Sequence, residues 1–94
     1  MTFTQIGYFL QVARTLNFSE AAVQLHMTQP TLSRQIAAIE AELNMPLFLR
    51  SKRRLRLTPA GALLKEELGG LMDSYQQIIE KAERASWGIS GSLR

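Results

Sequence analysis

The chain has 94 residues, a formal net charge of +3 and no cysteine. This length allows one small domain with a single modest core, plus an extension. Without cysteine there are no disulfides and no thiolate metal sites, and the single histidine stands alone, so we expect no metal and no cofactor. No apolar run reaches membrane-spanning length and no signal-peptide pattern opens the chain, so we expect a cytoplasmic protein.

The positive charge is concentrated in the first part of the chain. Residues 1–59 carry seven basic and three acidic side chains, whereas residues 60–94 carry four and five. Five of the eleven basic residues lie between Arg50 and Arg56, with no acidic residue among them. The positive field therefore belongs to residues 1–59.

Two short helices are predicted before His26. Apolar side chains recur at three- and four-residue steps from Phe3 to Leu16, which predicts an amphipathic helix over residues 4–16 in the centre of the core. Residues 17–19 break this helix, and we expect Phe18 to fill the core and Ser19 to cap a second helix over residues 19–25. The narrow inner face of this second helix would consist of Ala21, Ala22 and Leu25.

A longer helix is predicted over residues 28–43, after a tight corner at His26 and Met27. Thr28 is a good N-cap, and Pro30 falls in the first turn, where its missing N–H costs nothing. Asn44 suits a left-handed C-cap. The stripe that faces the core would consist of Leu32, Ile36, Ile39 and Leu43.

The opposite face of this third helix is small, polar and basic at its N-terminal end. At about 100° per residue it carries Pro30, Arg34, Ala37 and Ala41, flanked by Gln29, Ser33 and Thr31. Alanines allow close approach to DNA, Gln and Arg can donate to base edges in the major groove, and hydroxyls reach phosphates. A solvated helix face explains the pattern equally well when the helix is considered alone. The short helix, tight turn and longer helix together favour a DNA-binding helix-turn-helix.

A basic hairpin is predicted directly after the helix-turn-helix. Residues 47–49 and 55–57 have weak strand character, and the residues between them are strongly basic. Such a hairpin beside a recognition helix is the wing of a winged helix-turn-helix, placed to hold phosphates or to reach the minor groove. The alternative is a solvated run of charges. It is less favoured here, because the run follows the third helix after one short turn.

The last third of the chain predicts one long helix over residues 59–86, with Thr58 as its cap and Pro59 at its first position. Apolar and small residues continue at alternating steps of four and three as far as Ala85, which is the period of a coiled coil. A helix packed only on its own domain explains one stripe but not this length. We therefore expect a dimerisation helix whose seam contains Leu64, Leu68, Leu71, Tyr75, Ile78 and Ala82. A second stripe would then face the winged domain with Leu63, Met72 and Ile79.

Four motifs in register resemble the N-terminal domain of LysR-type transcriptional regulators. They begin at Phe18, Thr28, Pro46 and Leu57 and read FSxAAxxL, TQPTLSRQI, PLFxR and LTPAG. The resemblance covers residues 1–61 almost without gaps. It implies a helix-turn-helix over about residues 18–37 that reads bases with Gln29, Pro30, Thr31, Ser33 and Arg34. It also implies contacts to the DNA backbone from Thr28, Arg50 and the wing residues Lys52, Arg53 and Arg54.

The resemblance further implies a bacterial regulator that binds dyad-symmetric promoter sites as a homodimer, or as a tetramer for the full-length protein. In that family a hinge follows the long helix and leads to a larger domain that binds a small-molecule effector. Residues 87–94 have linker composition and would correspond to this hinge. We therefore expect a DNA-binding piece of a longer protein.

Three classes of function can be compared. A DNA-binding regulator explains the recognition helix, the basic hairpin and the long helix together. A protein adaptor built on the long helix would bind no DNA and leaves the basic hairpin unexplained. An enzyme is least favoured, because the sequence has no acid–base pair, metal cluster or phosphate-binding glycine loop. We therefore expect a mainly α protein that is not an enzyme: a winged helix-turn-helix over residues 1–58, with its wing at about 47–57, followed by a long dimerisation helix.

Overall fold

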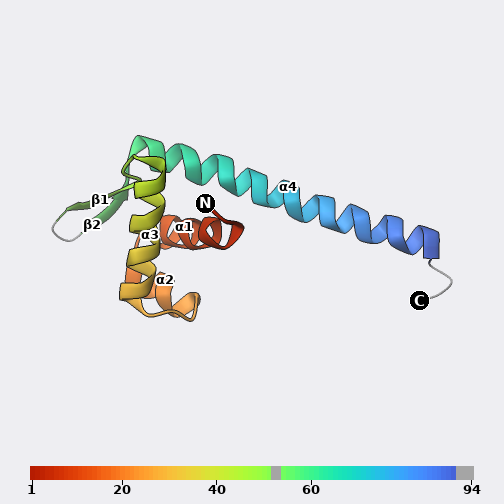
Figure 1. Cartoon of the computed structure of the whole chain (residues 1–94), viewed down its shortest axis with the longest axis horizontal. Helices are drawn as coiled ribbons and strands as arrows, with labels where there is room; N and C mark the ends of the chain where they lie inside the picture. The colour runs from red at the N-terminus through yellow and green to blue at the C-terminus, as the bar shows by residue number, and fades with distance from the viewer. Residues whose placement is uncertain (52–53, 91–94) are drawn as a thin grey trace.

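Three short helices and a two-stranded wing pack around one core, and a fourth helix leads away from it (Figure 1). The computed structural model describes residues 1–51 and 54–90. The elements in chain order are α1 (Phe3–Thr15), α2 (Phe18–Gln24), α3 (Gln29–Leu43), β1 (Phe48–Ser51), β2 (Arg54–Leu57) and α4 (Pro59–Ser90). The predicted fold class, a winged helix-turn-helix followed by a long helix, is confirmed.

The core is formed by the apolar stripes predicted for the first and third helices. Its largest fully buried side chains are Phe9 and Val12 from α1, Leu32, Ile36 and Ile39 from α3, and Leu47 from the segment before β1. The small buried side chains of Ala21 and Ala22 let α2 lie close to its neighbours. Because α3 buries one face so completely, its opposite face is the one presented to solvent.

Side-chain caps fix where the first two helices begin. In α1 the Thr2 hydroxyl accepts from the Gln5 N–H, and the Gln5 side chain accepts from the Thr2 N–H. The expectation for α2 is wrong, because Asn17 and not Ser19 is the N-cap. The Asn17 Oδ1 accepts from the Glu20 N–H at 2.9 Å. Asn17 has the extended backbone that a cap needs, so the helix begins one residue earlier than predicted.

The turn between α2 and α3 has the tight geometry expected at His26 and Met27. His26 adopts a left-handed backbone with φ 57°, and the Met27 N–H donates to the Ala22 carbonyl at 2.9 Å. Thr28 then caps α3 and Pro30 lies in its first turn, both as predicted. This turn brings α2 and α3 into the helix-turn-helix arrangement.

Near its C-terminal end, α3 holds the segment that leads into the wing. The helix ends as predicted at a left-handed Asn44, with φ 55°. One turn earlier, the Glu40 carboxylate accepts from the backbone N–H groups of Leu47 and Phe48, at 2.7 and 3.1 Å. A charged acceptor makes each of these bonds stronger than a neutral one. The position of β1 is therefore set directly by α3.

The predicted wing is present as an antiparallel pair, β1 and β2, in a register that sets Arg50 opposite Leu55. Side chains alternate between the two faces of a strand. Arg50 therefore lies on the same face as the buried Phe48, whereas Arg54 and Arg56 lie on the other face. Two residues predicted at the tip of the hairpin fall outside the described part of the chain, Lys52 and Arg53.

Thr58 joins the base of the wing to the start of α4. Its buried hydroxyl donates to the Pro46 carbonyl at 2.8 Å and accepts from the Gly61 N–H at 3.0 Å, which confirms its predicted capping role. The Thr58 N–H also donates to the Leu47 carbonyl at 3.0 Å. Together with the Glu40 bonds, these contacts form what we call the wing junction, made of Glu40, Pro46, Leu47, Phe48, Thr58 and Gly61.

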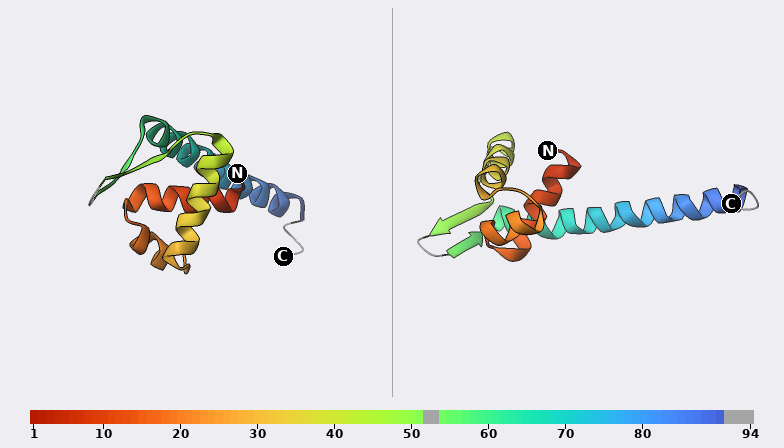
Figure 2. Two further views of the ribbon diagram at one scale, coloured as in Figure 1. Left: turned by 60° about the vertical axis from the view of Figure 1, so that its left-hand side comes forward. Right: turned by 90° about the horizontal axis from the view of Figure 1, so that it is seen from below.

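The first turns of α4 lie against α1, and the rest of the helix projects away from the core (Figures 1 and 2). The α4 side chains that pack against the core include Leu64, Leu68 and Met72. The prediction that Leu63 and Ile79 face the domain is wrong, because both are exposed, Leu63 by 61%. For Leu63 the reason is angular: the nine-residue step to Met72 is about two and a half turns, which places the two side chains on opposite sides of the helix.

α4 is also longer than predicted, because it continues to Ser90 and does not end near residue 86. Glycine and serine weaken a helix without necessarily ending it, so linker composition alone does not mark its end. The rest of the predicted hinge, residues 91–94, lies outside the described residues. The long axis of the molecule measures 59 Å. None of the helices in the described ranges is both long and apolar enough to cross a membrane.

A substitution at Gly61 tests the packing at the wing junction. A Cβ atom at this position would overlap the Leu47 carbonyl oxygen. We therefore expect Gly61→Ala to lower the free energy of unfolding by about 1–3 kcal/mol through overpacking. Gly70→Ala is the matched control, because a Cβ there meets nothing within 4 Å and replacing a helical glycine stabilises by about 0.5–1 kcal/mol. Urea unfolding followed by circular dichroism, at one protein concentration, measures both; a stabilised Gly61→Ala variant would contradict this packing.

Candidate nucleic-acid interface

The outward face of α3 and the first wing strand line an open groove of about 360 Å³. It is lined by Ala37 and by five of the residues predicted to contact DNA, namely Gln29, Pro30, Ser33, Arg34 and Arg50. None of the six is acidic. The groove therefore combines small side chains, which allow close approach, with two guanidinium groups that attract an anion.

Hydroxyl groups tie the first turn of α3 together. The Thr28 hydroxyl donates to the Thr31 hydroxyl oxygen at 2.7 Å and accepts from the Thr31 N–H at 3.3 Å. The Arg34 Nη2 donates to the same Thr31 oxygen in a longer bond of 3.4 Å. Thr31 is not among the residues that line the groove, but it accepts this hydrogen bond from Arg34, which does line it. Most of the five N–H donors of Arg34 stay available to a ligand.

Arg50 reaches the groove from the wing and rests on an aromatic ring. Its guanidinium carbon lies 4.8 Å from the centroid of the Phe18 ring, within the range of a cation–π contact. The Phe18 ring lies 6.2 Å from that of Phe48, which in turn lies 5.6 Å from the ring of Phe9 in the core. Sequence reasoning assigns Phe18 only to the core. The strand alternation that puts Arg50 on the face of Phe48 is the one signal that points toward this contact.

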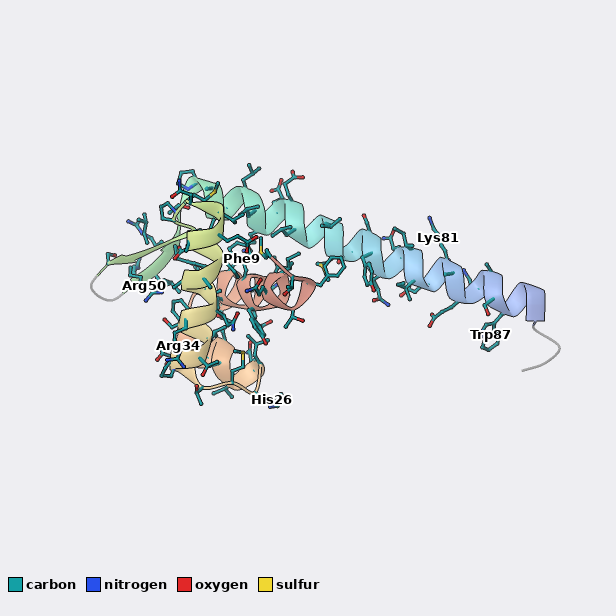
Figure 3. All side chains as sticks on the ribbon, in the orientation of Figure 1. Phe9, His26, Arg34, Arg50, Lys81 and Trp87 are labelled. Atoms are coloured by element: carbon teal, nitrogen blue, oxygen red, sulfur yellow. The ribbon has the colours of Figure 1, made fainter. Side chains whose placement is uncertain are left out.

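The other predicted contact residues lie around the groove. Thr28 is exposed at the start of α3, and Arg54 is exposed on the wing face opposite to that of Arg50. Figure 3 shows Arg34 and Arg50 at the same end of the molecule, far from Lys81 and Trp87 on α4. The structure thus brings Arg34 and Arg50 together at one groove, and it sets Arg54 apart from them.

The chemistry of the groove is that of hydrogen-bond donors and positive charge. Among the residues that the structure describes, no cluster of His, Cys, Asp or Glu side chains could hold a metal ion. His26 is exposed in the turn between α2 and α3. The groove is therefore suited to the phosphates and base edges of a polyanion.

A second candidate surface lies on α4, where the predicted seam divides into two parts. Leu64 and Leu68 pack against the protein's own core. The other members are exposed: Leu71 by 49%, Tyr75 by 42% and Ile78 by 60%, followed by Ala82. Tyr75 also touches its own domain, since its ring lies 5.2 Å from that of Phe3. A row of exposed apolar side chains on a projecting helix gains free energy when an apolar partner covers it.

Comparison with known proteins identifies the family. The family described as bacterial regulatory helix-turn-helix protein, lysR family, matches residues 3–62. The transcriptional regulator TfdS of Cupriavidus pinatubonensis is 39% identical over 93 residues, which are 99% of this chain and 32% of TfdS. A probable cat1 operon transcriptional activator of Acinetobacter lwoffii is 42% identical over 84 residues, 89% of this chain and 28% of the activator. The chain thus spans about a third of the length of these relatives, which are named as regulators of transcription and not as enzymes.

Two solved structures that contain DNA have the same fold. The BenM DBD in complex with benA site 1 DNA has a TM-score of 0.89 and 32% identity, covering 94% of this chain and 99% of that chain. Full-length CbnR complexed with its target DNA has a TM-score of 0.83 and 35% identity, covering 94% of this chain and 31% of CbnR. Since the family match covers more than half of the residues, the chain belongs to the lysR family of bacterial regulatory helix-turn-helix proteins and carries the DNA-binding domain of that family.

Proposed function

We propose that this chain recognises a dyad-symmetric promoter site as a homodimer, with α3 in the major groove and the wing on the DNA backbone or in the minor groove. The observation that carries the proposal is the acid-free groove in which Arg34 on α3 and Arg50 on β1 converge. The likeness to the structures of BenM and CbnR in complex with DNA supports DNA as the ligand.

We assign base recognition to the first two turns of α3. Gln29 and Arg34 offer paired donors that suit base edges, and Pro30 and Ser33 are small enough to let the helix enter the groove. The sequence assigns Thr31 to base reading, whereas in this proposal Thr31 positions Arg34. Its oxygen accepts from Arg34, so it would direct that guanidinium toward a base, whether or not it also touches DNA.

We assign the phosphate contacts to Thr28, Arg50 and the basic wing. Arg50 supplies a charge at the groove, and Arg54 supplies one on the other face of the hairpin, so the wing would contact more than one phosphate. Lys52 and Arg53 belong to the same proposal because of their sequence position. Whether one of them enters a narrow minor groove depends on the A·T content of the flanking DNA.

The exposed apolar stripe on α4 supports dimerisation. Two copies that pack these stripes together would bury Leu71 and Ile78 and would carry two recognition helices, as a dyad-symmetric site requires. Because the relatives are about three times as long, we further propose a domain beyond this chain. From the resemblance to the family, we propose that this domain binds a small-molecule effector and that the full-length protein is a tetramer. The hinge to that domain would follow α4.

The salt dependence of DNA binding tests the proposed function. Each phosphate contact contributes about 0.9 to the slope of log affinity against log salt concentration, so binding to duplex DNA should weaken steeply as salt is raised. Arg34→Ala should cost about 1–3 kcal/mol on a site selected from a random duplex pool and much less on random DNA, because it removes a base contact. Fluorescence anisotropy measures both affinities.

Arg14→Ala is the control for this experiment, since Arg14 is an exposed arginine of α1 that does not line the groove. It should leave both affinities nearly unchanged. Equal losses on selected and random DNA for Arg34→Ala would make Arg34 a phosphate contact and contradict its assignment to base recognition. No binding to either DNA at low salt would overturn the proposed function and favour an adaptor.

Charges placed on the α4 stripe test the dimer. Leu71→Asp with Ile78→Asp would bury unpaired carboxylates in the seam, so this double variant should sediment as a monomer while the unaltered chain sediments as a dimer. Leu63→Asp with Gln77→Asp adds the same charge to exposed positions on another side of the same helix, and it should stay dimeric. A dimeric seam variant would remove the stripe as the interface.

A further inference from the structure

We propose that Phe18 is a positioning residue for DNA binding: its ring holds the Arg50 guanidinium at the groove before DNA arrives. The inference rests on the proposed function, because it assumes that Arg50 contacts DNA. It assigns a binding role to a residue whose position in the core already accounts for its apolar character.

The contact follows from the alternation of side chains along β1. Phe48 points into the core, and Arg50, two residues further along, emerges on the same face just beyond the core's edge. The ring at that edge belongs to Phe18, whose centroid lies 4.8 Å from the guanidinium carbon. Arg50 also lines the groove together with Arg34 and Gln29, so the same side chain touches the ring and the candidate binding surface.

The Phe18 ring is held firmly enough to act as a platform. It lies at the first position of α2, directly after the Asn17 cap, and the Asn17 N–H also donates to the Thr15 hydroxyl oxygen at 3.3 Å. Behind it stands the ring of Phe48, at 6.2 Å between centroids. The helix cap fixes the backbone at Phe18, and the core on the other side limits the space into which the ring can turn. The ring can therefore serve as a support for the Arg50 guanidinium.

A ring is a better support for this arginine than a carboxylate would be. A cation–π contact uses the flat face of the guanidinium and leaves its five N–H donors free for phosphate oxygens. A carboxylate would occupy two of these donors and cancel the charge. Within the described residues, the one ion pair joins the Met1 amino group to Glu42, so no carboxylate there is paired with Arg50.

The consequence is a lower entropic cost of binding. An arginine side chain without such a contact samples many rotamers, and it loses this freedom when it binds a phosphate. With the ring in place, part of that loss has already occurred during folding. Phe18 should therefore make Arg50 more effective in binding DNA, although Phe18 itself need not touch the DNA.

A double-mutant cycle on DNA affinity tests this role. Arg50→Ala is measured in the unaltered chain, in Phe18→Leu, which keeps the apolar bulk but has no ring, and in Phe18→Tyr, which keeps the ring. We expect the fold-loss caused by Arg50→Ala to be roughly two to five times smaller in the Phe18→Leu background, and unchanged in Phe18→Tyr. Arg56→Ala is the matched control: this arginine lies on the opposite wing face, so its effect should be the same in all three backgrounds.

The outcomes separate the two proposals. If Arg50→Ala leaves DNA affinity unchanged when Phe18 is present, the proposed contact of Arg50 with DNA is contradicted. The positioning role of Phe18 is then contradicted as well. If Arg50→Ala causes the same fold-loss with and without the ring, the positioning role of Phe18 is overturned while the proposed function stands.

Nuclear magnetic resonance of the free chain gives a second readout that does not depend on DNA or on the folding of a variant. Protons of the Arg50 side chain that lie over the Phe18 ring should be shifted upfield in the unaltered chain. Arg50 protons at ordinary random-coil positions in the unaltered chain would overturn the proposal.

Discussion

The wing junction is the set of contacts on which the rest of the proposed DNA-binding face depends. Through it, the Glu40 carboxylate of α3 holds the backbone of Leu47 and Phe48, and the Thr58 hydroxyl holds the carbonyl of Pro46. Three elements that run in different directions, α3, the wing and α4, therefore meet at one short hydrogen-bonded segment. Leaving such partly buried groups unpaired would cost about 1–3 kcal/mol each, so the segment resists rearrangement. The helix α3 and the wing are thus held together as one unit.

The same junction separates two surfaces of different chemistry. On one side lies the groove of α3 and β1, with its arginines and no acidic residue in its lining. On the other, α4 leads away from the core toward Lys81 and Trp87, far from Arg34 and Arg50 (Figure 3). The side chains of Leu71 and Ile78 on this helix are exposed. A partner that covers the apolar stripe need not cover the groove. Charge and apolar surface are therefore divided along the molecule in the way that a dimeric DNA-binding protein requires.

Much of this arrangement can be predicted from local sequence, because helical periodicity and caps act within a few residues. The core stripe of α3, the left-handed Asn44 and the cap at Thr58 all follow from such rules. The cap of α2 does not, because Asn17 and Ser19 are both suitable cap residues and only the backbone conformation decides between them. Contacts between segments far apart in the chain cannot be predicted from these local rules. The bonds of Glu40 to the start of β1, and the ring contact of Arg50, depend on how the wing folds back.

A titration of the isotope-labelled chain with duplex DNA, followed by the backbone amide signals, tests the central claim most directly. If α3 and the wing form one rigid DNA-binding face, the amides of α3 from Gln29 to Ala37 and those of β1 should shift together and saturate at the same DNA concentration. The exposed stripe of α4 from Leu71 onward should show no comparable change. Shifts concentrated on that stripe, or α3 and β1 responding at different DNA concentrations, would contradict this account.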